Sequence, residues 1–338
     1  MKHIASNLVV AAVLAAAASF PLAARAETVK VGISRLLGYA GVPVALERGY
    51  FKAEGIDADM VEFHSAAPIG VAVASGDVDF GISGMSASFY TLAAQGQLRI
   101  IASGSSDHPG FYSLIAVVSN KAWNAGLKSP EDLPGHDIAI TQVGTSLHYS
   151  IGLLAQRYGF PMSSVRVKPL QSNPNVVSAL KGGTIDAAVM PTSPVMPLIA
   201  KGEIQKLGYI GEITDGFSGS MLFTSTKIAG EKPALVKRFL AAYRKGMRDF
   251  HDAFVGPNGE RKDGPLAPTI LAIMSKFTGL PPAQLEAAVP YLDPQGGVDT
   301  ADVARQIAWY KSQNLLKGDI RAEELVDHRY ALPLFASK

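Results

Sequence analysis

The feature that most constrains the fold of this chain is an internal pseudo-repeat. Residues 71–82 combine a short apolar helix, a glycine stop and a strand introduced by an aspartate, and residues 176–189 repeat that order. An upstream strand and helix also recur, over 29–51 and 138–160. The offset of about 107–110 residues is far longer than the period of a solenoid. Two copies of one α/β unit are therefore the simpler interpretation.

The alternation of strands and helices in each copy indicates a mostly parallel sheet with helices on both faces. Two longer β-like stretches, residues 111–119 and 220–226, flank the second copy and are natural crossovers. We therefore predict an α/β fold of two doubly wound lobes joined by two hinge strands near Val117 and Met221. In this prediction the second copy is inserted into the first, with lobe I formed by 27–117 plus 222–338 and lobe II by 118–221.

The C-terminal part of the chain has helical periodicity. An apolar stripe begins at Leu235, after Pro233, and a second amphipathic helix follows Asp299, with Val303, Ile307 and Tyr310 on one face. We interpret both stripes as ordinary hydrophobic core and assign them no function.

Residues 1–26 have the pattern of a cleaved secretory signal peptide. Lys2 supplies the positive start, residues 8–20 form an alanine-rich apolar run, and Ala24-Arg25-Ala26 fits an A-x-A cleavage site. The run is shorter than the roughly 20 residues that a membrane-spanning helix needs, and Pro21 follows it directly. No cysteine follows it to carry a lipid anchor. We expect a soluble, exported mature protein.

Charge and composition exclude several classes of function. Loss of Lys2 and Arg25 takes the formal net charge of the 338-residue chain from +2 to zero. A neutral chain without basic stretches has no electrostatic footprint for nucleic acid or for an anionic membrane. The chain has no cysteine, which excludes disulfides, thiolate nucleophiles and cysteine-ligated metal centres.

The candidate binding residues follow the predicted strands. Ligands of open α/β sheets bind outside the carboxyl ends of the strands, and in a two-lobed protein those ends face each other across a cleft. Six loops at these positions are small and polar. The candidate ligand-binding residues in and beside them are Ser34, Arg35, Leu36, Ser65, Ala66, Ser83, Gly84, Met85, Gly144, Thr145, Ser146, His148, Asn173, Pro191 and Thr192.

Two of these positions suit an anion. Gly144-Thr145-Ser146 opens a predicted helix, where free backbone N–H groups and the positive dipole end attract an anionic oxygen group. The alternative is that Thr145 or Ser146 only caps that helix. Arg35 could bind a carboxylate or sulfonate, or could be a surface charge or an interlobe ion pair. If Arg35 binds the anion, Arg35→Ala should weaken binding by roughly 1.5–3 kcal/mol.

We expect neither a metal site nor a cofactor. No histidine lies in an H-E-x-x-H motif or at metal spacing from another, so structural or solvent-facing roles are the default, with His148 kept as a hydrogen-bond donor. The chain has no G-x-S-x-G elbow, P-loop or dinucleotide fingerprint. We assign no catalytic residue and expect a protein that is not an enzyme.

Several motifs resemble one family. Residues 42–56 resemble the signature, ending in A-x-x-x-G-Y-F-x-x-E-G, of ABC-transporter substrate-binding proteins of the sulfonate/nitrate/taurine type, a group that includes binders of thiamine-pyrimidine precursors. Residues 75–81 and 128–135, the Gly144-Thr145-Ser146 turn and residues 299–327 match the same family. The resemblance implies the type II periplasmic-binding-protein fold, a periplasmic location and delivery of a solute to the membrane permease of an ABC importer.

The chain also departs from that family. Where the family often carries Trp-Asp-Pro, this sequence has Met190-Pro191-Thr192-Ser193-Pro194, so a relative's ligand is not carried over. The pyrimidine synthases similar to this fold use a cysteine-rich motif, which this chain cannot supply. We expect a monomer that captures a small organic anion, a sulfonate or carboxylate, aliphatic or aromatic, by hinge closure. The alternatives are a neutral heterocycle such as a pyrimidine, and a secreted α/β enzyme on the same fold.

Overall fold

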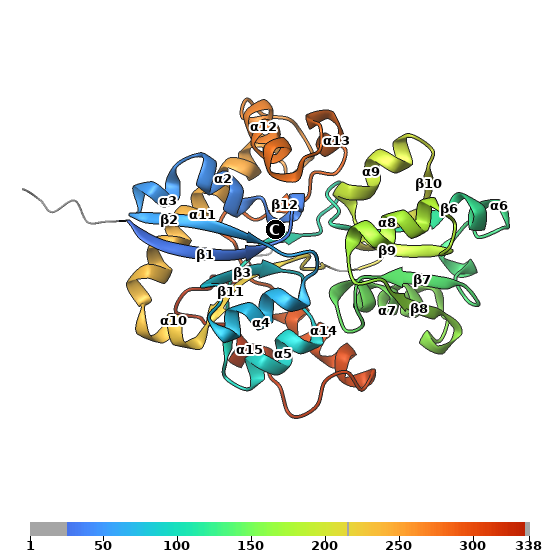
Figure 1. Ribbon diagram of the computed structural model, residues 1–338, viewed down its shortest axis with the longest axis horizontal. Coiled ribbons are helices and arrows are strands. Elements are labelled where there is room, and N and C mark those ends of the chain that lie inside the picture. The colour runs from blue at the N-terminus through green and yellow to red at the C-terminus, as the bar shows by residue number, and fades with distance from the viewer. Residues whose placement is uncertain (1–25, 215, 335–338) are drawn as a thin grey trace, which may run out of the picture.

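The computed structural model describes residues 26–214 and 216–334, so the predicted signal peptide lies outside the described residues except for Ala26. Within the described residues the chain forms two lobes, each with its own sheet and helices (Figure 1). The green and yellow middle of the chain forms lobe II, and the two ends of the chain form lobe I. The predicted fold class is confirmed.

The sheet of lobe I has the strand order β2-β1-β3-β11-β4. Strand β1 is parallel to β2 and β3, whereas β11 runs antiparallel between β3 and β4. The strands are β1 (Glu27–Ile33), β2 (Ile56–Glu62), β3 (Phe80–Ser83), β4 (Leu98–Ser103) and β11 (Met221–Ser225). A small antiparallel pair, β5 (Ser105–Ser106) with β12 (Tyr291–Leu292), lies beside this sheet.

The sheet of lobe II has the order β10-β6-β9-β7-β8, and here β6 is the antiparallel strand, between β10 and β9. Its strands are β6 (Leu114–Ser119), β7 (Asp137–Ile140), β8 (Arg166–Pro169), β9 (Ala187–Pro191) and β10 (Ile204–Tyr209). Residues 114–117, predicted for lobe I, thus pair in the second sheet, and Met221, predicted for lobe II, pairs in the first. The sequence of a continuous apolar strand does not show at which residue the chain passes from one lobe to the other. The domain boundaries otherwise remain a prediction.

Helices cover both faces of each sheet (Figure 1). Those of lobe I are η2 (Leu37–Tyr39), α2 (Gly41–Glu47), α3 (Tyr50–Ala53), α4 (Ala67–Ser75), α5 (Ala87–Ala94), α10 (Thr226–Glu231), α11 (Pro233–Phe254), α12 (Ala267–Thr278), α13 (Pro282–Glu286), α14 (Thr300–Ser312) and α15 (Ala322–Leu325). Those of lobe II are α6 (Asn120–Asn124), η3 (Pro130–Asp132), α7 (Ser146–Tyr158), η4 (Met162–Ser164), α8 (Asn173–Lys181) and α9 (Thr192–Ala200), with η5 (Ile210–Glu212) in the second crossover.

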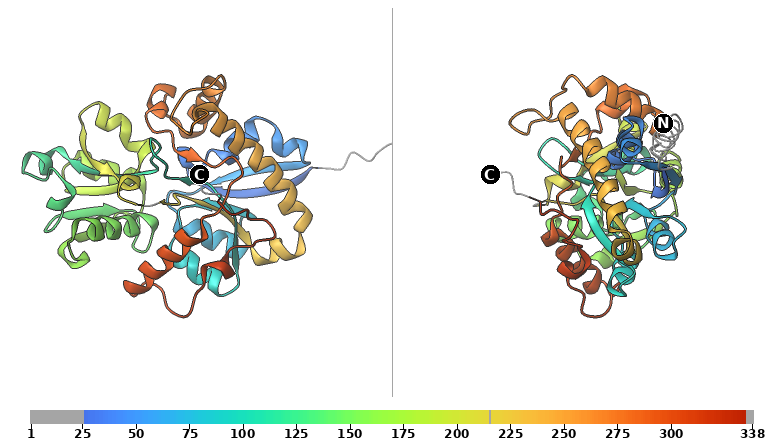
Figure 2. Two further views of the ribbon diagram at one scale, coloured as in Figure 1. Left: turned by 180° about the vertical axis from the view of Figure 1, so that it is seen from behind. Right: turned by 90° about the vertical axis from the view of Figure 1, so that its left-hand side faces the viewer.

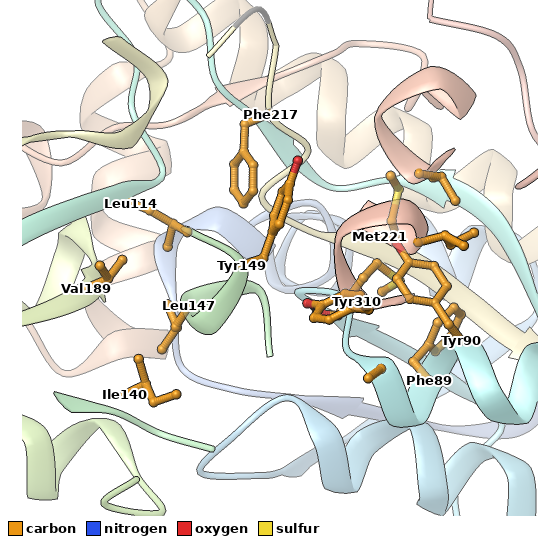
Figure 3. Close-up of a cluster of buried hydrophobic side chains, with 14 of the residues drawn as sticks. Phe89, Tyr90, Leu114, Ile140, Leu147, Tyr149, Val189, Phe217, Met221 and Tyr310 are labelled. Atoms are coloured by element: carbon orange, nitrogen blue, oxygen red, sulfur yellow. The ribbon is translucent and has the colours of Figure 1, made fainter. Parts of the chain in front are cut away.

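A hydrophobic cluster continues from one lobe into the other. Leu114, Leu147 and Val189 of lobe II lie on one side of it, Tyr90 and Tyr310 of lobe I on the other, with Tyr149 and Phe217 between them (Figure 3). Seen from behind, the red helix α14 runs from lobe I towards the green helix α7, with which it is in contact (Figure 2). The two lobes are therefore packed together.

The contact between α14 and α7 depends on a glycine. A Cβ atom at Gly152, in the middle of α7, would lie 2.1 Å from Nε1 of Trp309, so the indole ring occupies the space that a side chain would fill. Two hydrogen bonds hold α14 to lobe I: Tyr90 Oη donates to Gln306 Oε1 at 2.9 Å, and Tyr310 Oη donates to the Met85 carbonyl at 3.3 Å. Trp309 is thus a fixed part of lobe I that rests on the backbone of a lobe II helix.

Candidate ligand-binding site

A cavity lies between the two lobes and is bounded by residues of both. Its volume, measured for the centres of water-sized molecules, is about 60 Å³. Since about 10–15 Å³ on this measure holds one water, the cavity has room for about four to six water-sized groups. The lining residues are Ser34, Leu36, Leu37, Gly38, Tyr39, Ser65, Ala66, Gly84, Ser105, Ser113, Leu114, Thr141, Thr145, Ser146, Leu147, Asn173, Pro191, Thr192, Ser193, Gly219 and Pro290.

Ten of the fifteen candidate residues line this cavity. The structure brings together Ser34, Leu36, Ser65, Ala66 and Gly84 from lobe I with Thr145, Ser146, Asn173, Pro191 and Thr192 from lobe II. They are far apart in the sequence and meet because each follows the carboxyl end of a strand. That these ten residues contact a ligand remains a prediction.

Three helices begin at the cavity without a side-chain cap. The N-cap residues of α4, α7 and α9 are Ala66, Thr145 and Pro191, which all line the cavity, and none of their side chains accepts a hydrogen bond from its helix. The Thr145 hydroxyl instead donates to the Gln142 carbonyl at 2.8 Å. The positive dipole ends of three helices thus converge on one small space, which favours an anionic group there. Helix α7 adds its first-turn N–H groups, whereas Pro68 of α4 and Pro194 of α9 have no N–H and the Thr192 N–H donates to the Ser113 carbonyl at 3.0 Å.

The polar groups in the cavity are neutral. Nine lining residues are serine or threonine, and all nine are buried. Among the described residues, two buried atoms of the lining lack a hydrogen-bond partner, namely Ser113 Oγ and Asn173 Oδ1. Buried polar atoms are nearly always paired, so these two are positions where a bound molecule would supply a partner.

The lobes touch at the rim of the cavity. Ser86, which caps α5, forms an antiparallel bridge with Thr145, and the Ala87 N–H donates to the Gly144 carbonyl at 2.7 Å. A Cβ atom at Gly84 would lie 2.5 Å from Ser146 Oγ, so the absence of a side chain at Gly84 permits this approach. The two lobes are therefore in direct contact beside the cavity.

Four other candidates lie just outside the cavity. Ser83 is the buried last residue of β3 and pairs with Met221. Met85 is fully buried in the core. Gly144 adopts a φ of 77°, which favours glycine, and its N–H donates to Nδ1 of His148 at 3.2 Å. His148 thus accepts through Nδ1 and supports the turn before α7, which leaves the proton on Nε2, so its expected role as a donor remains a prediction.

The protonation state of His148 should affect the free energy of unfolding. Burial lowers its pKa to about 4 from an ordinary value of 6.5, because the charged ring would lose its hydration. The neutral ring is also the form that can accept from the Gly144 N–H. As pH falls below about 6.5, the unfolded chain takes up this proton before the folded protein does. We therefore expect the free energy of unfolding to fall between about pH 6.5 and 4, and to fall less steeply in His148→Gln, as urea titrations at several pH values would show. Equal slopes for both proteins would contradict this role.

Arg35 lies outside the cavity, although its neighbours Ser34 and Leu36 line it. Its Nε donates to Glu62 at 2.7 Å and its Nη1 donates to the Phe277 carbonyl at 3.2 Å, with about half of the side chain exposed. Residues 34–36 form a tight turn, in which the Leu36 N–H donates to the Ser34 carbonyl at 2.8 Å, and the sequence does not show which of its side chains faces the ligand.

This position revises the expectation for Arg35→Ala. An exposed ion pair contributes at most about 1 kcal/mol, and Arg35 would have to leave Glu62 to reach the cavity. We now expect Arg35→Ala to change the dissociation constant of a cavity ligand by less than about threefold in calorimetric titrations. A loss of tenfold or more would restore Arg35 to the site.

The sequence-based selection missed several lining residues. Ser105, Ser113 and Gly219 lie in the two crossovers between lobes, and Pro290 lies in a loop before β12. The strand-end rule applies to βα loops and says nothing about crossovers. Leu147 adjoins selected residues and Thr141 lies three positions before Gly144, so a wider window around the same loop would have included both.

Comparison with known proteins gives the family. The NMT1/THI5-like family description matches residues 38–253 of this chain, well over half of its length. The chain belongs to the NMT1/THI5-like family. This result confirms the resemblance seen in residues 42–56.

Individual relatives agree with that assignment. The taurine-binding periplasmic protein of Escherichia coli (strain K12) is 26% identical over 290 residues, covering 83% of each chain. A binding protein of Brucella abortus (strain 2308) is 28% identical over 239 residues, 69% of this chain and 70% of that protein. The fold matches that of the alkanesulfonate-binding protein SsuA from Xanthomonas axonopodis pv. citri, bound to MOPS, with a TM-score of 0.73 at 18% identity over 89% of this chain and 98% of that one.

Residues 26–214 and 216–334 lack two further features. No group of three or more histidine and acidic side chains is placed to hold a metal ion within these ranges. No helix in the same ranges has the length and apolar character needed to cross a membrane.

Proposed function

We propose that this protein is the exported solute-binding component of an ABC importer, and that it captures a small organic anion, a sulfonate or carboxylate, in the interlobe cavity. Delivery to a membrane permease and action in the periplasm as a monomer belong to the same proposal. The family assignment supports the binding role, because the similar proteins are named as binding proteins for taurine and alkanesulfonate.

The observation that carries the choice of an anion is the convergence of three uncapped helix N-termini on one buried space. Helices α4, α7 and α9 each direct a positive dipole end at the cavity, and α7 adds its first-turn N–H groups. The buried hydroxyls of Ser34, Ser65 and Ser146 add neutral donors from both lobes. An oxyanion can accept hydrogen bonds from all of these groups at once.

Closure follows from the division of the site between lobes. A solute shifts the balance between open and closed forms only if it binds the closed form more tightly. Lobe I contributes Ser65 and Ala66, and lobe II contributes Thr145 and Ser146, so a solute held by all four bridges the lobes. The direct contact between Ser86 and Thr145 then forms at the rim. A permease could recognise the closed form.

The test is a binding screen with purified mature protein. Thermal-shift measurements with small sulfonates, aliphatic and aromatic carboxylates, and pyrimidines should show stabilisation by one or more anions, confirmed as one-to-one binding by calorimetry. If only pyrimidines stabilise the protein, the ligand is a neutral heterocycle rather than an anion. Turnover of a bound compound would instead indicate an enzyme.

A further inference from the structure

Among residues 26–214 and 216–334, those that line the interlobe cavity include none with an ionised side chain. Its 21 lining residues include no lysine, arginine, histidine, aspartate or glutamate. Tyr39 is the one lining side chain with a titratable proton, and burial raises its pKa to about 12, so it too stays neutral at physiological pH. The cavity therefore presents dipoles and hydroxyls only, together with a few apolar side chains.

Behind the cavity wall, the Asp107 carboxylate accepts from the Ser113 N–H at 2.7 Å, and burial raises its pKa to about 7. Further charged groups lie in an adjoining groove. This groove shares Ser34, Leu36 and Asn173 with the cavity and is lined further by Arg35 and Glu62. The Glu62 carboxylate accepts from Arg35 Nε at 2.7 Å, so its charge is already compensated. A cationic group inside the cavity would find no carboxylate among the lining residues to pair with, since Asp107 lies behind Ser113.

The helix ends make the cavity still less suitable for a cation. Burying an ammonium group without a paired carboxylate carries a large desolvation cost. The positive ends of α4, α7 and α9, which attract an anion, repel a cation in the same space. Attraction of the anionic head and exclusion of a second, cationic group thus have the same origin.

We infer that the cavity selects organic anions whose remaining part is uncharged, and that it rejects zwitterions in which an ammonium group accompanies the sulfonate or carboxylate. This inference rests on the proposed function and narrows its ligand class. It sets this protein apart from its relative named as taurine-binding, since taurine is 2-aminoethanesulfonate.

Two lining atoms indicate what the uncharged part can carry. Ser113 Oγ and Asn173 Oδ1 are buried without a partner among the described residues. An uncharged donor such as a hydroxyl group can satisfy either oxygen without bringing a charge into the cavity. A hydroxyl-bearing anion should therefore bind at least as tightly as its alkyl counterpart.

The test compares three compounds that differ at one group. Ethanesulfonate, 2-hydroxyethanesulfonate and taurine are titrated into the full mature protein by calorimetry at neutral pH, alongside the carboxylates propionate, 3-hydroxypropionate and β-alanine. We expect each amino compound to bind at least about 30-fold more weakly than its alkyl counterpart. Equal or tighter binding of the amino compounds would overturn the inference and leave the proposed function standing. If none of the six compounds binds, the proposed class of small organic anions is wrong, and this inference falls with it.

A charge-adding variant tests the cause of the selectivity. Asn173→Asp places a carboxylate in the cavity at nearly the same size, and as the first residue of α8 it should stay ionised because of the helix dipole. We expect the ratio of taurine to ethanesulfonate affinity to rise by about tenfold or more. Asn314→Asp, at an exposed position outside the cavity, adds the same charge and should leave the ratio unchanged. An unchanged ratio in Asn173→Asp would overturn the electrostatic explanation.

Discussion

In Thr145→Asp we expect affinity for ethanesulfonate to fall by about 100-fold or more while the protein stays folded. Thr145 is the N-cap of α7 in an extended conformation, with φ of −92° and ψ of 170°, and its side chain does not cap the helix. Aspartate is one of the best capping residues and would accept from the N–H groups that the anion needs. In this variant the introduced carboxylate occupies the N–H groups of α7 that a bound anion would otherwise use.

Stability and affinity should move differently in this variant. An acidic N-cap stabilises a helix by about 0.3–1 kcal/mol, so the melting temperature should hold or rise, unless burial of the carboxylate offsets the gain. Thr145→Asn is the matched control, because it can cap the helix without a charge. We expect a smaller loss of affinity in this control, measured by calorimetry beside thermal melts. If both variants bind ethanesulfonate like the natural protein, the α7 terminus is not the anion site.

The second prediction concerns the contact between Trp309 and Gly152. In Gly152→Ala the new methyl group overlaps the indole ring, because a Cβ there lies 2.1 Å from Nε1. Overpacking of this kind costs about 1–3 kcal/mol. Since Trp309 belongs to lobe I and Gly152 to lobe II, the closed arrangement bears most of that cost. We expect ethanesulfonate affinity to fall by about tenfold.

Fluorescence and a second glycine variant complete this experiment. A displaced Trp309 should emit at longer wavelength, because it is more exposed to water. Gly230→Ala, in α10, is the matched control, since its Cβ would meet no atom within 4 Å and alanine favours a helix. It should bind ethanesulfonate normally. Normal binding and unchanged emission in Gly152→Ala would show that α7 and α14 do not move apart when the lobes open.

Much of the architecture could be predicted from the sequence, because local pattern determines it. The pseudo-repeat indicated two α/β units, and the glycine stops and apolar runs located most strands and helices. The same reasoning selected Thr145 and Ser146, since a small polar loop before an apolar helix is a local signal. The structure places both residues on the cavity.

What could not be predicted depends on contacts between distant segments. Nothing near Arg35 shows that Glu62 and Phe277 hold it away from the cavity. Nothing in the stripe that contains Tyr310 shows that the neighbouring Trp309 crosses to the other lobe. The crossover residue Ser113 reaches the cavity only because the lobes pack together. Each outcome depends on which surfaces meet, and periodicity within one segment does not contain that information.

The placement of β11 has a consequence for the order in which the molecule can be completed. This strand lies between β3 and β4, and β4 has no other partner strand in that sheet. If only residues 27–113 were present, β4 would have no partner strand and one edge of β3 would be unpaired, with apolar side chains exposed. The sheet of lobe I therefore cannot be completed until the chain is available up to about residue 225. A chain that emerges from its amino end thus keeps this lobe incomplete through about two thirds of its length, a delay that suits the export proposed for this protein.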